Sequence, residues 1–128
     1  MKKLIFLLLA VVLLTACGQD KQNGQKVVYV NITAEEAKQI MDTEVGYIIL
    51  DVRTQEEYDQ GHIPGAILIP DTEIKAKAEE VLTDKDQLIL VYCRSGRRSK
   101  LAAEALVELG YTNIKEFGGI IDWPYEVE

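Results

Sequence analysis

The chain is predicted to fold as an α/β domain, with a central, mainly parallel sheet of five strands flanked by helices on both faces. Two observations lead to this prediction. Short runs of apolar and β-branched residues alternate with amphipathic stretches along the chain, which is the pattern of a parallel sheet with helical connections. Two of the runs, YIILD and QLILVYC, are apolar between their end residues, as expected for strands buried on both faces.

The predicted strands are the runs in which branched and aromatic residues dominate. In chain order they are residues 27–32, 47–51, 66–70, 87–93 and 112–117. The predicted helices carry start or stop signals. Thr33 and Glu36 form a capping box before the first helix, and Gly61 and Gly110 end the second and the fourth. In chain order the helices are residues 34–41, 54–61, 71–82 and 99–110.

Residues 1–17 differ in kind from the rest of the chain. A cationic MKK start, an apolar run of eleven residues (Leu4–Leu14) and small residues at a cleavage point form the pattern of a secretory signal. The run is too short to span a membrane, which takes about 20 apolar residues. The sequence LTAC, Leu14–Cys17, resembles the lipobox of bacterial lipoprotein signals. That resemblance implies cleavage before Cys17 and fatty acyl chains such as palmitate on its lipid. The alternative is an ordinary secretory signal with a chance cysteine.

These features divide the chain into a lipoprotein signal peptide at residues 1–17, a flexible, polar tether at 18–26 and one folded domain at 27–128. The lipid is expected to anchor the protein to the extracytoplasmic face of a bacterial membrane, in the cell envelope. Without residues 1–17, the chain has 12 Lys and Arg against 21 Asp and Glu, a net charge of −9. Such a surface repels nucleic acid, so no nucleic-acid partner is expected.

Cys93 is the candidate nucleophile. It ends the predicted strand 87–93, and the loop RSGRR leads from it into the predicted helix 99–110. Ligands of parallel sheets bind outside the carboxyl ends of the strands, and the free amides at the start of a helix attract anions. Gly96 lets the loop curl so that more amides point at the same spot. These surroundings favour a reactive thiolate, whereas an inert core cysteine would have apolar neighbours on both sides.

The positive charge of this loop and the spacing between its cysteine and arginines limit the reactions that it could catalyse. Four cationic side chains follow the cysteine closely, namely Arg94, Arg97, Arg98 and Lys100. Cysteine phosphatases use the pattern C-x₅-R, in which the arginine cradles the phosphate oxygens. Here the position six residues after the cysteine is Ser99, and Arg98 lies at plus five. The loop is one residue too short for that pattern, which argues against phosphoryl transfer and arsenate reduction.

Three blocks of the sequence resemble rhodanese-like sulfurtransferases. They are CRSGRR (Cys93–Arg98), the Asp-Val-Arg block with its Gly-His-Ile-Pro-Gly-Ala turn (Leu50–Pro70) and the active-site block with its helix and glycine-rich turn (Tyr92–Trp123). The resemblance implies a rhodanese-like fold and a thiosulfate sulfurtransferase-like enzyme. In that chemistry the Cys93 thiolate takes the outer sulfur of a donor such as thiosulfate as a persulfide, and sulfite leaves. A thiophilic acceptor, either cyanide or a thiol, then removes the sulfur.

The resemblance also implies which residues bind the small anionic donor. They are the residues of the loop that follows Cys93, namely Arg94, Ser95, Gly96, Arg97, Arg98 and Ser99. At least one of the arginines is expected to form an ion pair with the acidic body instead. No cofactor is implied, and one histidine with one free cysteine does not suggest a metal site. The protein is expected to be a monomer.

Four other residues could have either a structural role or a role in the site. Asp51 and Arg53 follow a neighbouring strand, and an ion pair that orders the loop is favoured over a part in catalysis. His62, the single histidine, lies in the Gly-His-Ile-Pro-Gly-Ala turn and is expected to be structural rather than a general base. Trp123 is expected to lie in the core or to form a lid near the site.

Two other functions stay open. A non-catalytic carrier of persulfide or sulfide, or a binding module in the cell envelope, would need the same loop. Thiol redox chemistry is a third hypothesis. It is weakened because no resolving cysteine remains in the chain if Cys17 carries lipid.

Overall fold

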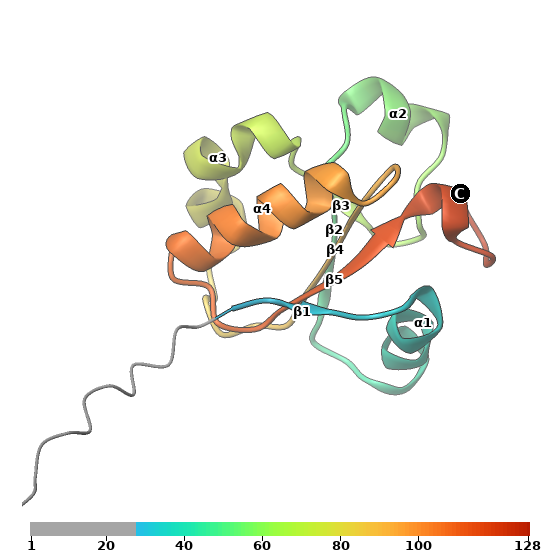
Figure 1. Cartoon of the computed structure of the whole chain (residues 1–128), viewed down its shortest axis with the longest axis horizontal. Helices are drawn as coiled ribbons and strands as arrows, with labels where there is room; N and C mark the ends of the chain where they lie inside the picture. Colours follow the sequence, from blue (N-terminus) through green and yellow to red (C-terminus); the bar gives the residue numbers. More distant parts are fainter. Residues whose placement is uncertain (1–27) are drawn as a thin grey trace, which may run out of the picture.

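The strands form one sheet in which every neighbouring pair is parallel. A computed structural model describes residues 28–128 (Figure 1), and its strands lie in the order β1-β5-β4-β2-β3. The strands are β1 (Val30–Asn31), β2 (Ile48–Asp51), β3 (Ile67–Leu68), β4 (Ile89–Cys93) and β5 (Ile114–Gly119). The predicted fold class is confirmed. The predicted signal peptide, the lipidation site Cys17 and the tether at 18–26 lie outside the described residues.

Helices cover both faces of the sheet. They are α1 (Ala34–Thr43), α2 (Gln55–Gln60), α3 (Ile74–Val81) and α4 (Arg97–Glu108), with the short 3₁₀ helices η2 (Asp71–Glu73) and η3 (Ile120–Asp122). α3 and α4 pack on one face and α1 packs on the other (Figure 1). The layers therefore follow the predicted arrangement.

Two threonines start helices by the same local mechanism. The hydroxyl oxygen of Thr33 accepts a hydrogen bond from the Glu36 amide at 3.0 Å, and the Glu36 carboxylate accepts one from the Thr33 amide at 2.9 Å. This is the predicted capping box, which satisfies two amides that the helix leaves free. Thr54 and Glu57 form the same arrangement at the start of α2, and this second box places Glu57 near the cysteine loop.

Several predicted elements have different bounds in the structure. β1 and β3, the two edge strands of the sheet, contain two residues each. The helix predicted at 71–82 begins as η2, where the Glu73 amide donates to the carbonyl of Pro70 at 2.8 Å, and α3 starts at Ile74. The last helix starts at Arg97 instead of Ser99, directly after the left-handed Gly96. The first turn of α4 is thus part of the cysteine loop.

Two apolar cores hold the sheet between its helices. The core under α3 and α4 includes Leu50, Val91 and Leu106, and the core under α1 includes Leu90 and other buried residues. All residues of β4 are buried. The strand that carries the cysteine is therefore the central strand of the sheet and is buried along its whole length.

β5 carries a bulge beside the end of β4. Val91 pairs with Glu116, but Cys93 pairs with Gly119, so two steps along β4 match three along β5. Gly118 lies in the bulge with a φ of 91°, a left-handed conformation that glycine adopts without steric cost. The bulge brings Gly119 next to the loop that follows the cysteine.

Candidate active site

Cys93 lies where the predicted anion site was expected, at the carboxyl end of β4 and the start of α4. Its side chain is buried, with 1% of the residue exposed. The Gly96 amide donates a hydrogen bond to Cys93 Sγ at 3.0 Å, and Ser99 Oγ lies 3.3 Å from the same sulfur. Amide donors at a helix start favour negative charge on the atom that they contact. The sulfur therefore has the surroundings of a nucleophile rather than of an inert core cysteine.

The loop from Cys93 to α4 is held by backbone contacts with the turn after β5. Gly96 has a φ of 105°, which only glycine adopts readily. The Ile121 amide donates to the carbonyl of Arg94 at 3.2 Å. A Cβ atom at Gly119 would lie 1.9 Å from that same carbonyl oxygen. A side chain at this position is excluded, and the close contact fixes the path of the loop.

The three arginines of the loop have different surroundings. Arg94 and Arg97 are exposed, and neither pairs with a carboxylate of residues 28–128. Arg98 donates to both carboxylate oxygens of Glu57, at 2.8 and 3.0 Å. Arg98 is thus the arginine that forms an ion pair with the acidic body, as was expected of at least one. Arg94 and Arg97 remain available for an anion in solution.

The contact with Arg98 changes the acidity of Glu57. The hydrogen bonds from Arg98 hold its pKa at about 2, below its ordinary value of 4.5, and the bonds from Thr54 act in the same direction. Glu57 therefore stays ionised through the physiological range. Because Glu57 caps α2 and Arg98 lies in the first turn of α4, this ion pair ties α2 to the cysteine loop.

Asp51 and Arg53 form a buried pair that orders a neighbouring loop. Arg53 donates to both oxygens of Asp51, with a shortest distance of 2.7 Å, and to the carbonyl of Gly61 at 2.7 Å. The Tyr92 hydroxyl donates to Asp51 at 2.6 Å and accepts from the Ile63 amide at 3.1 Å. Burial, together with Asp51, raises the pKa of Tyr92, so its phenol stays neutral. These contacts hold the Gly-His-Ile-Pro-Gly-Ala turn, which agrees with the structural reading of the pair.

His62 and Trp123 also have structural surroundings. The His62 ring stacks on Tyr58 with centroids 3.8 Å apart, and its Nδ1 lies 3.1 Å from the Tyr58 carbonyl. Trp123 packs against Phe117 and Tyr125 in the core under α1, and it is 8% exposed. No hydrogen bond joins either residue to Cys93 within the part of the chain that the structure describes.

Glu116 is a residue of the site that the sequence did not single out. It lies on β5 with no exposed surface. One of its carboxylate oxygens accepts from the Ser99 hydroxyl and from the Gly118 amide, the latter at 2.9 Å. The other accepts from the Asn31 side chain. The one sequence signal was a glutamate in the predicted strand that leads into the glycine-rich turn. A solvent-exposed glutamate would give the same signal, so the sequence alone did not indicate its burial.

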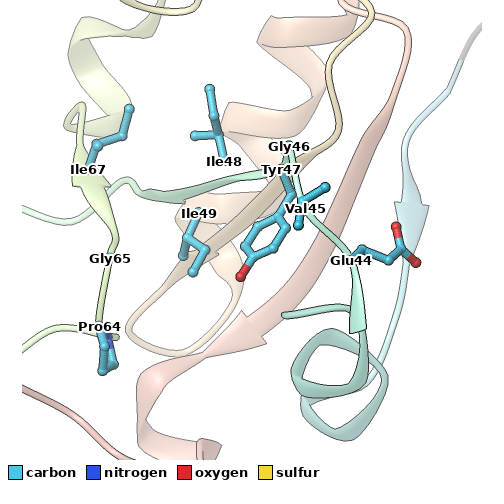
Figure 2. Close-up of a pocket in the computed structure, with 9 residues that line it drawn as sticks. All are labelled: Glu44, Val45, Gly46, Tyr47, Ile48, Ile49, Pro64, Gly65 and Ile67. Carbon is cyan, nitrogen blue, oxygen red and sulfur yellow. The ribbon is translucent and has the colours of Figure 1, made fainter. Parts of the chain in front are cut away.

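A hollow of about 450 Å³ lies at the other end of the sheet. Figure 2 shows it at the amino ends of β2 and β3, with Tyr47, Ile49 and Pro64 among its lining residues. The lining is mainly apolar and contains no cysteine. Because Cys93 ends β4 at the carboxyl edge, this hollow is separate from the cysteine loop.

Residues 28–128 also bear on the presence of membrane-spanning helices and of metal sites. None of the helices in this range has the length and apolar character needed to cross a bilayer. In the same range, no three His, Cys, Asp or Glu side chains come together as a metal site would require.

The fold and the site define a class of protein: a parallel α/β domain with one buried cysteine on the loop between a central strand and the next helix. The family model of the rhodanese-like domain matches residues 33–124. The chain therefore belongs to the rhodanese-like sulfurtransferase family.

Similar proteins support this assignment. Thiosulfate sulfurtransferase PspE of Escherichia coli is 44% identical over 73 residues, which are 57% of this chain and 70% of that protein. The putative sulfur carrier protein YrkF of Bacillus subtilis is 39% identical over 98 residues, which are 76% of this chain and 52% of that protein, so this chain spans about half its length. A solved structure of a rhodanese with anions from E. coli has a TM-score of 0.60 and 39% identity, covering 64% of this chain and 96% of that chain.

Glu57→Gln is expected to lower the free energy of unfolding at neutral pH by about 1 kcal/mol, because it removes a partly exposed ion pair with Arg98. A carboxylate whose pKa is lowered by folding stabilises the protein above its ordinary pKa and loses that effect as pH falls. The difference between wild type and variant should therefore shrink as the pH falls from 4.5 towards 2. Urea unfolding at several pH values measures it. Glu56→Gln is the control, and a difference that stays constant over this pH range would contradict the assignment.

Gly119→Ala is expected to displace the cysteine loop, because the added methyl group meets the backbone of Arg94 and Ser95. We expect a loss of about 1–3 kcal/mol in the free energy of unfolding, as for other overpacked sites. The rate of Cys93 alkylation by iodoacetamide should also change. Gly46→Ala is the control for a glycine replacement that costs stability without touching the loop, because its Cβ meets open space and its cost comes from the positive φ. It should lower stability and leave the alkylation rate as in wild type; equal alkylation rates in all three proteins would contradict the role of Gly119.

Proposed function

We propose that the protein transfers sulfane sulfur from a donor such as thiosulfate to a thiophilic acceptor through a persulfide on Cys93. One observation carries the proposal. The Cys93 sulfur accepts a hydrogen bond from the Gly96 amide at 3.0 Å. This contact lies at the start of α4, where backbone donors stabilise an anion. The same donors suit both the attacking thiolate and an anionic persulfide.

In the first step the Cys93 thiolate attacks the outer sulfur of the donor. A bond forms between Cys93 Sγ and that sulfur, the S–S bond of thiosulfate breaks, and sulfite leaves with the electron pair. The product on the enzyme is a persulfide whose negative charge lies on the terminal sulfur. Amides of the loop and of the first turn of α4 are the groups that would stabilise this charge.

In the second step a nucleophilic acceptor attacks the terminal sulfur. With cyanide the product is thiocyanate, and with a thiolate it is the persulfide of the acceptor. The bond to Cys93 Sγ breaks and the cysteine leaves as a thiolate, which returns the site to its starting state. The cycle needs no oxidant or reductant besides the donor and the acceptor.

The arginines divide between binding and structure in this proposal. Arg94 and Arg97 are exposed at the rim of the loop, where two positive charges attract a dianionic donor. Arg98 is engaged by Glu57 and supports the loop instead. The E. coli relative named thiosulfate sulfurtransferase supports thiosulfate as a donor.

A carrier of sulfur is the second candidate. The B. subtilis relative is named a putative sulfur carrier protein, and a carrier would use the same persulfide on Cys93. The two candidates differ in turnover. An enzyme releases many equivalents of product, whereas a carrier is loaded once and waits for a partner protein.

We also propose a lipid anchor at Cys17, which rests on the LTAC pattern alone. Two or more acyl chains give stable attachment, at about 0.8 kcal/mol for each buried methylene group. The domain would then act at the membrane surface, outside the cytoplasm.

Wild-type protein incubated with thiosulfate is expected to gain the mass of one sulfur atom, and Cys93→Ser is expected to gain none. With thiosulfate and cyanide together, the wild type should form thiocyanate repeatedly and Cys93→Ser should form none. Intact mass spectrometry and a thiocyanate assay measure these results. Added sulfur without turnover would favour the carrier, and neither added sulfur nor thiocyanate would refute sulfur transfer from thiosulfate.

Cys17→Ser is expected to move the protein from the membrane fraction to the soluble fraction of a bacterial host, because it removes the atom that carries the lipid. Immunoblots of separated fractions measure the change. Cys93→Ser is the matched control and should stay with the membrane. Retention of Cys17→Ser in the membrane fraction would rule out the lipid anchor.

A further inference from the structure

Glu116 is a fully buried carboxyl group that the two steps above do not use. It has no exposed surface, and it accepts hydrogen bonds from Asn31, Gly118 and Ser99. These donors are all neutral. Among residues 28–128, no lysine, arginine or histidine forms an ion pair with it. Any negative charge on Glu116 is therefore offset by neutral hydrogen-bond donors alone.

The Ser99 hydroxyl lies between this carboxyl group and the reactive sulfur. Ser99 Oγ is 3.3 Å from Cys93 Sγ and also contacts Glu116 Oε2. A hydroxyl has one proton to donate. If Cys93 and Glu116 were both anions, Ser99 could donate to only one of them, and the other buried charge would lack that donor. When the thiol and the carboxyl group have one proton between them, both the Cys93–Ser99 and the Ser99–Glu116 hydrogen bonds have a donor and an acceptor.

We propose that Glu116 accepts the proton of the Cys93 thiol through Ser99 and holds it while Cys93 is a thiolate. The S–H bond of Cys93 breaks and its proton goes to the Ser99 oxygen, while the Ser99 hydroxyl proton goes to Glu116 Oε2. Ser99 then donates to the thiolate and accepts from the neutral carboxyl group. The pair keeps one negative charge throughout. This role rests on the proposed function, in which the thiolate is the group that takes up sulfur.

Other charged or titratable groups face the pair from β1 and α4. Burial raises the pKa of Tyr29, just before β1, and the charges of Glu104 and Glu116 raise it further, so its phenol stays neutral. On α4, the pKa of Arg98 is raised chiefly by Glu57, which binds it, and to a smaller extent by a charge on the nearby Cys93 sulfur. Neither group can accept the thiol proton through Ser99. Within residues 28–128, Glu116 is the carboxyl group connected to the sulfur by hydrogen bonds.

A shared proton has a measurable consequence. Two coupled groups titrate in two steps that belong to the pair. The first step removes one proton from the fully protonated pair and gives a fraction of thiolate. The second removes the shared proton at higher pH, and between the steps the thiolate fraction stays level. For a lone thiol, the thiolate fraction instead falls about tenfold for each pH unit below the thiol pKa.

The test is the rate of Cys93 alkylation by iodoacetamide as a function of pH. It uses the full-length protein, and peptide mass analysis separates Cys93 from Cys17. The wild type is expected to show a level region between two steps. Glu116→Gln keeps the size of the side chain but cannot take the proton, so it is expected to show one step. Below the pH of that step, its alkylation rate should fall about tenfold per pH unit.

Glu104→Gln is the matched control, because it removes an exposed carboxylate from α4 and should keep both steps. Ser99→Ala removes the bridging hydroxyl and should give one step, as Glu116→Gln does. A single step in the wild type, or two steps in Glu116→Gln, overturns the proposal.

A second measurement needs no substitution and so remains valid if Glu116→Gln does not fold. Thiolate is followed by its ultraviolet absorbance, and a protonated carboxyl group by its infrared carbonyl band. At neutral pH, where exposed carboxyl groups are ionised, the amount of protonated carboxyl group should equal the amount of thiolate. Thiolate without that band overturns the proposal.

Neither measurement uses a sulfur donor. Alkylation and spectroscopy can therefore exclude proton sharing while thiocyanate formation still supports sulfur transfer. Conversely, proton sharing can be observed in a protein that forms no thiocyanate. Failure of this inference and failure of the proposed function are thus separate results.

Discussion

The close contact between Gly119 and the carbonyl of Arg94 is the constraint on which the site depends. The bulge at Gly118 brings the end of β5 against the loop, and the absence of a side chain at Gly119 lets the two backbones touch. With its path fixed, the loop presents the Gly96 amide to the sulfur of Cys93. The anion site is therefore a property of the backbone, and in the proposed function its side chains attract the substrate.

The positive charge of the loop serves two purposes in an acidic protein. Arg98 is bound by Glu57 and connects α4 to α2, so its charge is largely used inside the molecule. Arg94 and Arg97 are exposed to solvent, where the proposed function has them attract the anionic donor. The pair of Asp51 and Arg53 is enclosed in its own network and orders a different loop. In the proposed function, the charged residues that hold the fold together and those that attract the donor are thus different residues.

Local patterns were sufficient to predict the fold and the position of Cys93. The capping box at Thr33 and the buried run that ends at Cys93 each depend on residues a few positions apart. The contacts of Arg98 with Glu57 and of Ser99 with Glu116 join residues 41 and 17 positions apart. They depend on strand order and on a bulge, neither of which is visible in hydrophobic periodicity. The start of α4 was misplaced for a related reason, because the left-handed Gly96 ends the loop earlier than the apolar pattern suggests.

The burial of Cys93 also bears on which atoms a partner molecule can reach. With 1% of the residue exposed, the unloaded sulfur offers almost no surface to the disulfides of other proteins. Loading lengthens the side chain by one S–S bond, about 2.05 Å. In the proposed cycle, an acceptor protein therefore meets the transferred sulfur and not the cysteine. The full and empty states would then differ in how far the reactive sulfur extends from the cysteine.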